Sequence, residues 1–407
     1  MKSFISILLF CLVLKANSHG MSVVFSWKQI SYNFDGVIYT KSSDYDRTIG
    51  YNVHFADELQ DAEKFFIQYN NVPIGFEVYG DTVFVTVPRR RHGIPSTLNY
   101  VKLSDANPVL RPYPDITSSS LVSVYRPRVD ECGRLWMVDT GLLEVPGERK
   151  QIQPPTIVVY DLNSNRQILR YQLKPTDLVD EKTPGGLTSI AVDVGCSCED
   201  TYAYINDLAT NGLIVFSLRE RDSWRIQDDS FKLDEGALNF TVAGHVINWR
   251  DGLFSVALSN RDATNCRTAF FHPLVSTQEF GINTAVLKSS RHGYLSGKPT
   301  LLGTRGPLTQ SGSHDYYNGM LFFANVAQDG ILCWNTRKPL TPENMVLVAQ
   351  DHEKLVYISD LKVKAGEVWV LVNQIPRFVY STLDPTQNNF YILKGRVPDL
   401  IKNTRCA

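Results

Sequence analysis

The residue types that carry out chemistry are present in this chain, but not at the spacings of the standard catalytic motifs. There is no Gly-x-Ser-x-Gly turn for a nucleophilic serine and no glycine-rich phosphate loop. His352 and Glu353 lack a second histidine at helical spacing, so they do not form a zinc-binding helix. The other histidines are scattered, at His54, His92, His245, His272, His292 and His314. Scattered histidines more often make structural hydrogen bonds, so we predict no metal site, no cofactor and no identifiable catalytic residue.

Polar side chains end several apolar runs of the chain. Asp139, Asn206, Asn325 and Asn373 each follow an aromatic or aliphatic run. Carboxylates and amides at such positions commonly cap hairpin turns, and they equally suit a cavity in which several strands converge. The pattern alone leaves both interpretations open.

The first residues have the composition of a cleavable secretion signal. Lys2 precedes an apolar run from Phe4 to Leu14, and the exit sequence Ala16-Asn17-Ser18 follows it. The run is about half of the roughly 20 residues needed to cross a bilayer. We therefore predict a signal peptide over residues 1–18 and a secreted mature chain over 19–407, with no membrane span.

The cysteines and one glycosylation sequon suit an exported protein. With Cys11 in the predicted signal, an even number of cysteines remains: Cys132, Cys196, Cys198, Cys266, Cys333 and Cys406. Two or three disulfides are expected, because such bonds are stable outside the cell. Asn239 begins the only Asn-x-Ser/Thr sequence and is the predicted glycosylation site.

The charge balance argues against nucleic acid as the main partner. The chain carries 41 Lys and Arg against 42 Asp and Glu, whereas phosphate binding needs a basic excess. The local exception is Arg89-Arg90-Arg91-His92, which we interpret as a solvent-exposed strand end or loop.

A pattern of turn residue, short aromatic run and polar residue recurs along the chain. Its six instances are DTVFVTVP, GRLWMVDTG, DTYAYINDL, DGLFSVALSN, GMLFFANV and GEVWVLVNQ. Their central aromatic residues lie roughly 47 to 68 residues apart, near the period of four-stranded propeller blades. Because no linker divides the chain, we predict a single all-β domain over 19–407, a six-bladed β-propeller with four-stranded blades.

Longer stretches resemble a known family. VYRPRVDECGRLWMVDTG, CEDTYAYINDLATNGLIVFSLRERDSWR and NGMLFFANVAQDGILCWNT, followed by SDLKV and VWVLVNQ, look like successive signatures of the yellow/major royal jelly family. The resemblance also implies a six-bladed propeller. It further implies the disulfides Cys132–Cys198 and Cys266–Cys333, and leaves Cys196 and Cys406 open.

Within this family the chain is similar to the salivary yellow-related proteins of sand flies, which bind biogenic amines. The resemblance implies an amine site in which Ser359 supplies a hydroxyl, Asn373 an amide oxygen, Ile375 a backbone carbonyl and Tyr357 an aromatic wall. A protonated amine needs convergent oxygen acceptors, and its ring needs flat apolar walls. The expected ligands of the protein, a predicted monomer, are serotonin, dopamine, noradrenaline, adrenaline and histamine. Asp139 or another pore-lining acid is left to supply the negative charge.

Three functions suit such a protein. A secreted salivary binding protein would sequester host amines, counteract vasoconstriction and platelet activation, and need no catalytic group. A dopachrome-converting enzyme needs a histidine or an acid beside its pocket for proton transfer, and the sequence identifies none. A storage or interaction protein would carry compositionally biased tails, which the end RVPDLIKNTRCA lacks. The sequence therefore favours amine binding over an enzyme, with dopachrome conversion as the alternative.

Overall fold

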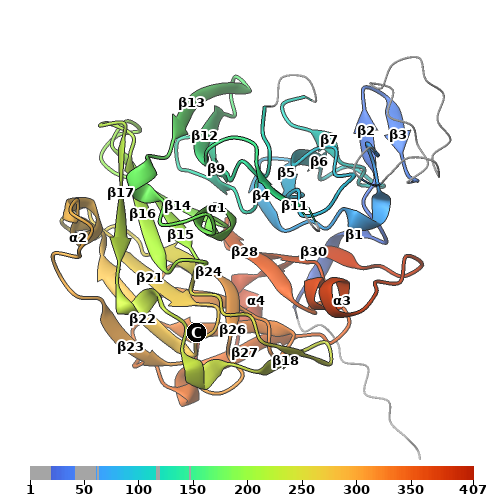
Figure 1. Cartoon of the computed structure of the whole chain (residues 1–407). Helices are drawn as coiled ribbons and strands as arrows, with labels where there is room; N and C mark the ends of the chain where they lie inside the picture. The colour runs from blue at the N-terminus through green and yellow to red at the C-terminus, as the bar shows by residue number, and fades with distance from the viewer. Residues whose placement is uncertain (1–19, 42–60, 62–63, 116–119, 146–147) are drawn as a thin grey trace, which may run out of the picture.

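Six antiparallel sheets of four strands each follow one another along the chain and form the blades of a β-propeller (Figure 1). The computed structural model describes residues 20–41, 61, 64–115, 120–145 and 148–407. The predicted signal peptide, residues 1–18, lies outside this part of the chain. The predicted fold class, an all-β six-bladed propeller with four-stranded blades, is confirmed.

In blades 1 to 5 the four strands run in chain order from the centre of the propeller outward. Blade 1 contains β4 (Gly75–Tyr79), β5 (Thr82–Thr86), β6 (Leu98–Lys102) and β7 (Arg111–Pro112), and blade 2 contains β8 (Arg128–Val129), β9 (Arg134–Asp139), β12 (Thr156–Asp161) and β13 (Arg166–Gln172). Blade 3 contains β14 (Ile190–Val194), β15 (Thr201–Asp207), β16 (Gly212–Ser217) and β17 (Asp222–Gln227). Blade 4 contains β20 (Leu253–Leu258), β21 (Thr268–Pro273), β22 (Gln278–Asn283) and β23 (Thr300–Thr304), and blade 5 contains β24 (Ser311–Tyr317), β25 (Met320–Asn325), β26 (Gly330–Asn335) and β27 (Met345–Gln350).

Blade 6 is completed by the other end of the chain. Its inner strands are β28 (Ile358–Lys364), β29 (Glu367–Val372) and β30 (Phe390–Arg396), and its outermost strand is β1 (Ser22–Trp27). β1 pairs antiparallel with β30, and the two lie side by side where the blue and red ends of the ribbon meet in Figure 1. This pairing closes the ring between the first and last parts of the described chain.

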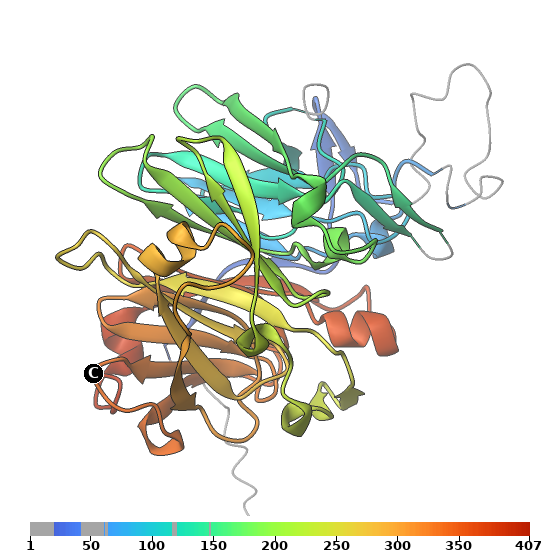
Figure 2. The ribbon, with the colours of Figure 1, turned by 60° about the vertical axis from the view of Figure 1, so that its left-hand side comes forward.

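The innermost strands β4, β8, β14, β20, β24 and β28 contact one another in ring order around a central channel. Strands beside them are buried on both faces, because each blade packs between two others. All six residues of β9, for example, are buried. In Figure 2 the N-terminal blades, blue to green, and the C-terminal blades, yellow to red, occupy opposite sides of the molecule.

Short hairpins and helices connect the strands. The additional hairpins are β2 (Tyr32–Phe34) with β3 (Val37–Tyr39), β10 (Leu142–Val145) with β11 (Glu148–Gln151), and β18 (Phe240–Val242) with β19 (His245–Ile247). The helices are α1 (Thr183–Gly186), α2 (Thr284–Ser289), α3 (Ile375–Tyr380) and α4 (Val397–Ile401), with 3₁₀ turns at Gln68–Asn70, Pro175–Asp177, Asp229–Phe231, Glu235–Ala237 and Pro342–Asn344. Three of these elements, β10, α1 and α3, contribute residues to a cavity of the channel. No helix among the described residues is long and apolar enough to span a bilayer.

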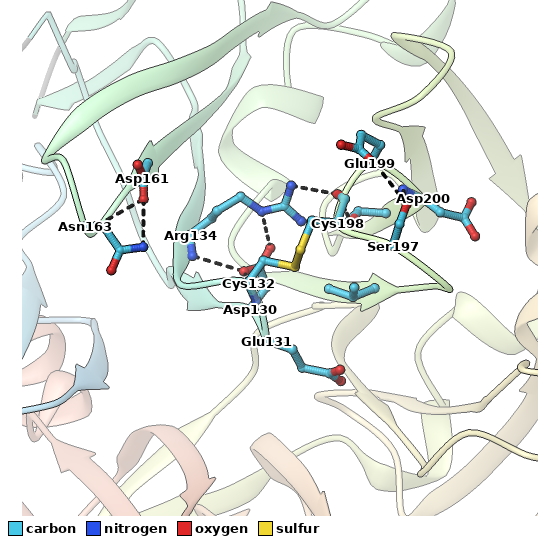
Figure 3. Close-up of a disulfide and its surroundings, with 12 residues drawn as sticks. Asp130, Glu131, Cys132, Arg134, Asp161, Asn163, Ser197, Cys198, Glu199 and Asp200 are labelled. Carbon is cyan, nitrogen blue, oxygen red and sulfur yellow. Dashed lines mark hydrogen bonds and ion pairs between the residues drawn. A yellow bond between two sulfur atoms is a disulfide. The ribbon is translucent and has the colours of Figure 1, made fainter.

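The disulfide between Cys132 and Cys198 joins blades 2 and 3, as the resemblance implied (Figure 3). Cys132 lies in the turn between β8 and β9, and Cys198 in the turn between β14 and β15. Arg134 fixes both turns: its guanidinium lies 2.7 Å from Asp130 Oδ2 and donates to the Cys198 carbonyl oxygen at 2.7 Å.

The implied Cys266–Cys333 pair is wrong, because Cys333 is bonded to Cys406. Cys333 points from β26 into a buried cluster that also contains Cys406 near the C-terminus. Cys266 lies instead in the loop before β21. This loop reaches toward blade 3, because the side-chain nitrogen of Asn265, the residue before Cys266, is 2.8 Å from Cys196 Sγ. Cys196 and Cys266 are both unbonded. The two disulfides are consistent with a protein exported from the cell.

The predicted glycosylation site occupies an accessible turn. Asn239 is exposed, has a φ of 60° and directly precedes β18. An exposed turn is the setting that a glycan requires, and glycosylation of Asn239 stays a prediction.

Candidate functional site

Two cavities lie along the central channel. The aromatic pocket, of about 360 Å³, is lined by Ile74, Arg90, Tyr125, Glu144, Gly185, Thr188, Leu208, Trp249, Arg250, Asp251, Phe254, Tyr357, Ser359 and Ile375. The charged cavity, of about 270 Å³, is lined by later residues of the same innermost strands, such as Ser255 of β20 and Asp360 of β28. Since β20 and β28 line the aromatic pocket with their first residues and the charged cavity with later ones, the two cavities follow one another along the channel axis.

Aromatic side chains form the walls of the aromatic pocket. The rings of Trp249 and Tyr357 meet edge to face, with centroids 5.9 Å apart, and Trp249 also stacks on Tyr380 of α3. The Arg126 guanidinium lies over the Phe254 ring, 4.7 Å from its centroid. Such walls present flat surfaces to a planar ring.

Three of the four predicted amine-site residues line this pocket. Tyr357 directly precedes β28, Ser359 lies within that strand, and Ile375 begins α3. The Ser359 hydroxyl donates to the carbonyl oxygen of Ile74, and the Ser359 carbonyl accepts from Arg126 Nε at 2.8 Å. Ser359 thus joins blade 6 to blades 1 and 2 at the pocket wall.

Asn373, the fourth predicted residue, is fully buried and does not line the pocket. Its amide nitrogen donates to the Pro73 carbonyl oxygen at 2.9 Å, and its amide oxygen accepts from the Ile375 backbone at 3.1 Å. In this structure Asn373 holds the start of α3 against blade 1.

The sequence interpretation missed an acid in the pocket, Asp251. Within the part of the chain that the structure describes, no hydrogen bond or ion pair reaches its carboxylate. Burial raises the pKa of Asp251 to about 6, although the positive charges of Arg90 and Arg126 oppose the rise. Asp251 begins the repeat DGLFSVALSN, and aspartates also begin other repeats, so its type and position gave no sign that it faces a ligand cavity.

A second acid, Glu144, lies in the same pocket on the β10–β11 hairpin. It accepts a hydrogen bond from the Tyr125 hydroxyl, and its Oε2 is 4.0 Å from Arg90 Nε. Burial, and then the charge of Glu144, raise the pKa of Tyr125 far above its ordinary value, so this phenol stays protonated.

The Arg89–His92 run forms a loop after β5, as predicted, but of its four residues only Arg90 is exposed, and Arg89, Arg91 and His92 are half-buried. The Arg89 guanidinium donates to four backbone carbonyls of neighbouring loops. Arg90 faces the aromatic pocket. The run is therefore partly a structural anchor and partly a source of positive charge.

Comparison with known proteins gives the family. The sequence profile of the family described as "Major royal jelly protein" matches residues 122–406. The chain belongs to the major royal jelly protein family. It is 40% identical to L-dopachrome tautomerase yellow-f of Drosophila melanogaster, with 94% of this chain and 93% of the relative covered. It is also 34% identical to the dopaminechrome tautomerase of that species, with 84% and 78% covered, and 34% identical to its protein yellow, with 84% and 65% covered.

Solved structures are less similar to this royal jelly family member. Virginiamycin B lyase from Staphylococcus aureus is 11% identical, with a TM-score of 0.44, and the match covers 80% of this chain and 95% of that chain. A nidogen/laminin complex contains a chain that is 12% identical, with a TM-score of 0.43 and 82% and 96% covered.

The other polar residues singled out at strand ends bond to backbone groups of turns and of neighbouring strands. The Asp139 carboxylate is buried and accepts from the backbone of Val122, Ser123 and Gly141 and from the Gln153 side chain. Asn206 accepts from the Ser189 backbone at 2.7 Å, and Asn325 from two backbone groups of its own turn. Turn formation therefore holds at Asp139 and Asn325, whereas Asn206 also donates to the Leu253 carbonyl oxygen at 3.0 Å and so joins blade 3 to blade 4. The pocket acids are Asp251 and Glu144.

The fold brings together two of the histidines that are scattered in the sequence. Side-chain ligand atoms of His272, Glu279 and His314 lie within 4.8 Å of one another, and all three residues are buried. Arg305 Nη1 lies 2.6 Å from Glu279, so the single carboxylate of this group is already neutralised. A divalent cation would add uncompensated positive charge to a buried site, so the group does not fit a metal centre.

Proposed function

We propose that this protein is a tautomerase of aminochromes, the cyclised quinones of catechol amines, and that the aromatic pocket is its active site. Asp251 carries the proposal, because it is a carboxylate without a hydrogen-bond partner among the described residues in an aromatic-walled pocket. The names of two relatives, L-dopachrome tautomerase yellow-f and dopaminechrome tautomerase, support the substrate class.

The reaction needs only proton transfer. Protons leave carbons of the five-membered ring, and protons are added to the two quinone oxygens, with no net gain or loss of electrons. A base must therefore lie near the ring carbon, and hydrogen-bond donors near the quinone oxygens. No redox cofactor is required.

Asp251 is suited to the role of the base. With a pKa of about 6 it is ionised at neutral pH, yet it is more basic than an ordinary aspartate. Tyr125 keeps its phenol proton, but its O–H donates to Glu144 in this structure, so it serves as a donor to a quinone oxygen only when that O–H turns from Glu144 toward the substrate. The ring walls and the volume of about 360 Å³ suit a small bicyclic compound.

The decisive experiment follows the loss of dopachrome and dopaminechrome colour with the purified protein. Asp251→Asn keeps the shape of the side chain but removes the base, and we expect it to lower kcat by about 100-fold or more. Asp229→Asn, which removes an exposed carboxylate from a surface turn, serves as the control and should leave kcat unchanged. Full activity in Asp251→Asn would refute the proposal.

Stoichiometric amine binding is a second candidate, favoured by the presence of carboxylates among aromatic walls. A protonated amine would pair with Asp251, and its ring would lie between Trp249 and Tyr357. The proposed ligands remain serotonin, dopamine, noradrenaline, adrenaline and histamine, with the Ser359 hydroxyl and the Ile375 carbonyl as acceptors. Asn373, which does not line the pocket, would contribute by holding the start of α3, where Ile375 lies. On this proposal the secreted protein would act in saliva.

Titration calorimetry separates the two functions. One-to-one binding of serotonin, weakened in both Asn373→Ala and Asp251→Asn, together with no conversion of aminochromes, would support a binding protein. Catalytic turnover of dopachrome that serotonin inhibits would instead support the enzyme. An absence of both binding and turnover would remove both candidates.

A further inference from the structure

We propose that the charged cavity is a second site, in which Ser255 is the nucleophile of a small-ester hydrolase. Ser255 Oγ lies 2.7 Å from His314 Nδ1, and His314 Nε2 lies 3.2 Å from Glu279 Oε1. Both Ser255 and His314 line the charged cavity. A serine, a histidine and a carboxylate in this order are the groups that activate a hydroxyl for attack on a carbonyl carbon.

The carboxylate in this arrangement is firmly held. Glu279 Oε2 lies 2.8 Å from His272 Nδ1 and 2.6 Å from Arg305 Nη1, while Oε1 faces His314. Burial favours the neutral acid, but His272 and His314 together keep the pKa of Glu279 below its ordinary value. His314 Nε2 and Glu279 Oε1 are within ion-pair distance, but among the described residues neither atom has a hydrogen-bond partner. The negative charge of Glu279 favours a proton on the nitrogen that faces it, Nε2, and with that tautomer Nδ1 accepts the proton of Ser255.

A charged donor is available for the oxygen that becomes negative during the reaction. Arg126 lines the same cavity and is 5% exposed, and its Nη1 has no hydrogen-bond partner in the described part of the chain. Its guanidinium lies over the ring of Phe254, the residue before Ser255. The Arg126 guanidinium donates from Nε to the Ser359 carbonyl oxygen, so Nη1 is the nitrogen available to stabilise an oxyanion.

The chemistry balances with water as the second reactant. Ser255 Oγ bonds to the carbonyl carbon while its proton moves to His314 Nδ1, and that proton then goes to the departing alcohol oxygen as the ester C–O bond breaks. Water, deprotonated by His314, next attacks the acyl-serine and releases the carboxylic acid, which restores the Ser255 hydroxyl.

The cavity also limits the substrate. Its volume of about 270 Å³ admits a small acyl group. Three basic residues of its lining are paired with acids: Arg128 with Asp315, Lys362 with Asp360 and Lys364 with Glu77. The preference for a short ester with a negative charge on its acyl part therefore rests on Arg126, whose Nη1 has no partner in the described part of the chain. The aromatic pocket takes no part in this reaction, so the inference does not depend on the proposed tautomerase.

Covalent labelling of the unaltered protein gives the first test. A fluorophosphonate probe reacts with activated serines, and peptide mass spectrometry should find the adduct on Ser255. Labelling confined to other residues, or no labelling at all, would overturn the proposal whatever the behaviour of any variant.

Hydrolysis assays give the second test, with p-nitrophenyl acetate and the p-nitrophenyl monoester of succinate as substrates. Ser255→Ala should lower the rate by about 100-fold or more, and His314→Gln by a similar factor. Ser313→Ala is the matched control, because Ser313 lines the same cavity but its hydroxyl bonds to Asp360 rather than to a histidine. Equal rates for Ser255→Ala and the unaltered protein would refute the proposal, and aminochrome turnover together with thermal unfolding would check that each variant is folded.

Discussion

At the scale of single residues, the ionisation of Asp251 links catalysis to pH. Its carboxylate lies in the aromatic pocket with a pKa of about 6, against an ordinary value of 3.8. If Asp251 is the base, kcat/KM for dopachrome should fall about tenfold for each pH unit below 6, because only the ionised form accepts a proton. A pH–rate profile with its acid limb near 4 instead of 6 would contradict this role.

The same pKa shift makes a prediction for stability. Because the folded protein holds this proton more tightly than the unfolded chain, ionisation of Asp251 destabilises the fold progressively from pH 3.8 to about 6 and fully above that. Asp251→Asn should therefore raise the free energy of unfolding by about 1 to 2 kcal/mol at pH 7.5, and the gain should vanish near pH 4. Denaturant unfolding at the two pH values measures the difference, and a gain that is equal at both would show that ionisation is not its cause.

Arg90 is expected to select between two related substrates. L-dopachrome carries a carboxylate that dopaminechrome lacks, and Arg90 is the basic residue that faces both acids of the aromatic pocket. Loss of one charge-assisted hydrogen bond costs about 1.5 to 3 kcal/mol. Arg90→Gln should therefore lower kcat/KM for L-dopachrome by about tenfold or more. The same substitution should leave kcat/KM for dopaminechrome nearly unchanged. Arg91→Gln is the matched control, because Arg91 lies over Phe378 outside the pocket. Equal losses for both substrates would contradict the assignment.

At the scale of the elements, the repeat in the sequence identified strands well but not their places in the blades. Five of the six runs form the second strand of a blade, for example β9 and β29, whereas DGLFSVALSN forms β20, the first strand of blade 4. First and second strands are both buried between neighbouring blades, so hydrophobicity does not distinguish them. The same limit applies to the site: the family resemblance located Tyr357, Ser359 and Ile375, but Asp251 and Glu144 reach the pocket from a loop and a hairpin of other blades.

The disulfides show this limit most directly, and they are testable. The family resemblance implied a pair of Cys266 and Cys333, yet β26 directs Cys333 toward the C-terminal segment. Non-reducing peptide mapping should therefore recover Cys132–Cys198 and Cys333–Cys406, and an alkylating reagent should modify Cys196, which is exposed, before Cys266. Recovery of a Cys266–Cys333 peptide would contradict the structure.

At the scale of the whole molecule, β1 determines whether the propeller stays closed. Both cavities are lined by inner strands of several blades, so their shape depends on the ring. Trp27 of β1 is 6% exposed and its indole nitrogen donates to the Pro108 carbonyl oxygen, which joins the last blade to the connection between β6 and β7 of blade 1. Trp27→Ala should lower the free energy of unfolding by about 3 to 5 kcal/mol, because it removes a large buried side chain and this hydrogen bond.

Val23→Ala provides the control for that experiment, because Val23 lies on the same strand but is 45% exposed. Its free energy of unfolding, measured in urea, should stay within about 0.5 kcal/mol of the unaltered protein. If β1 acts as the closure, Trp27→Ala should also weaken aminochrome turnover and ester hydrolysis together, although it touches neither cavity. A stable Trp27→Ala protein with both activities intact would show that the remaining β28–β30 contacts keep the ring closed without it.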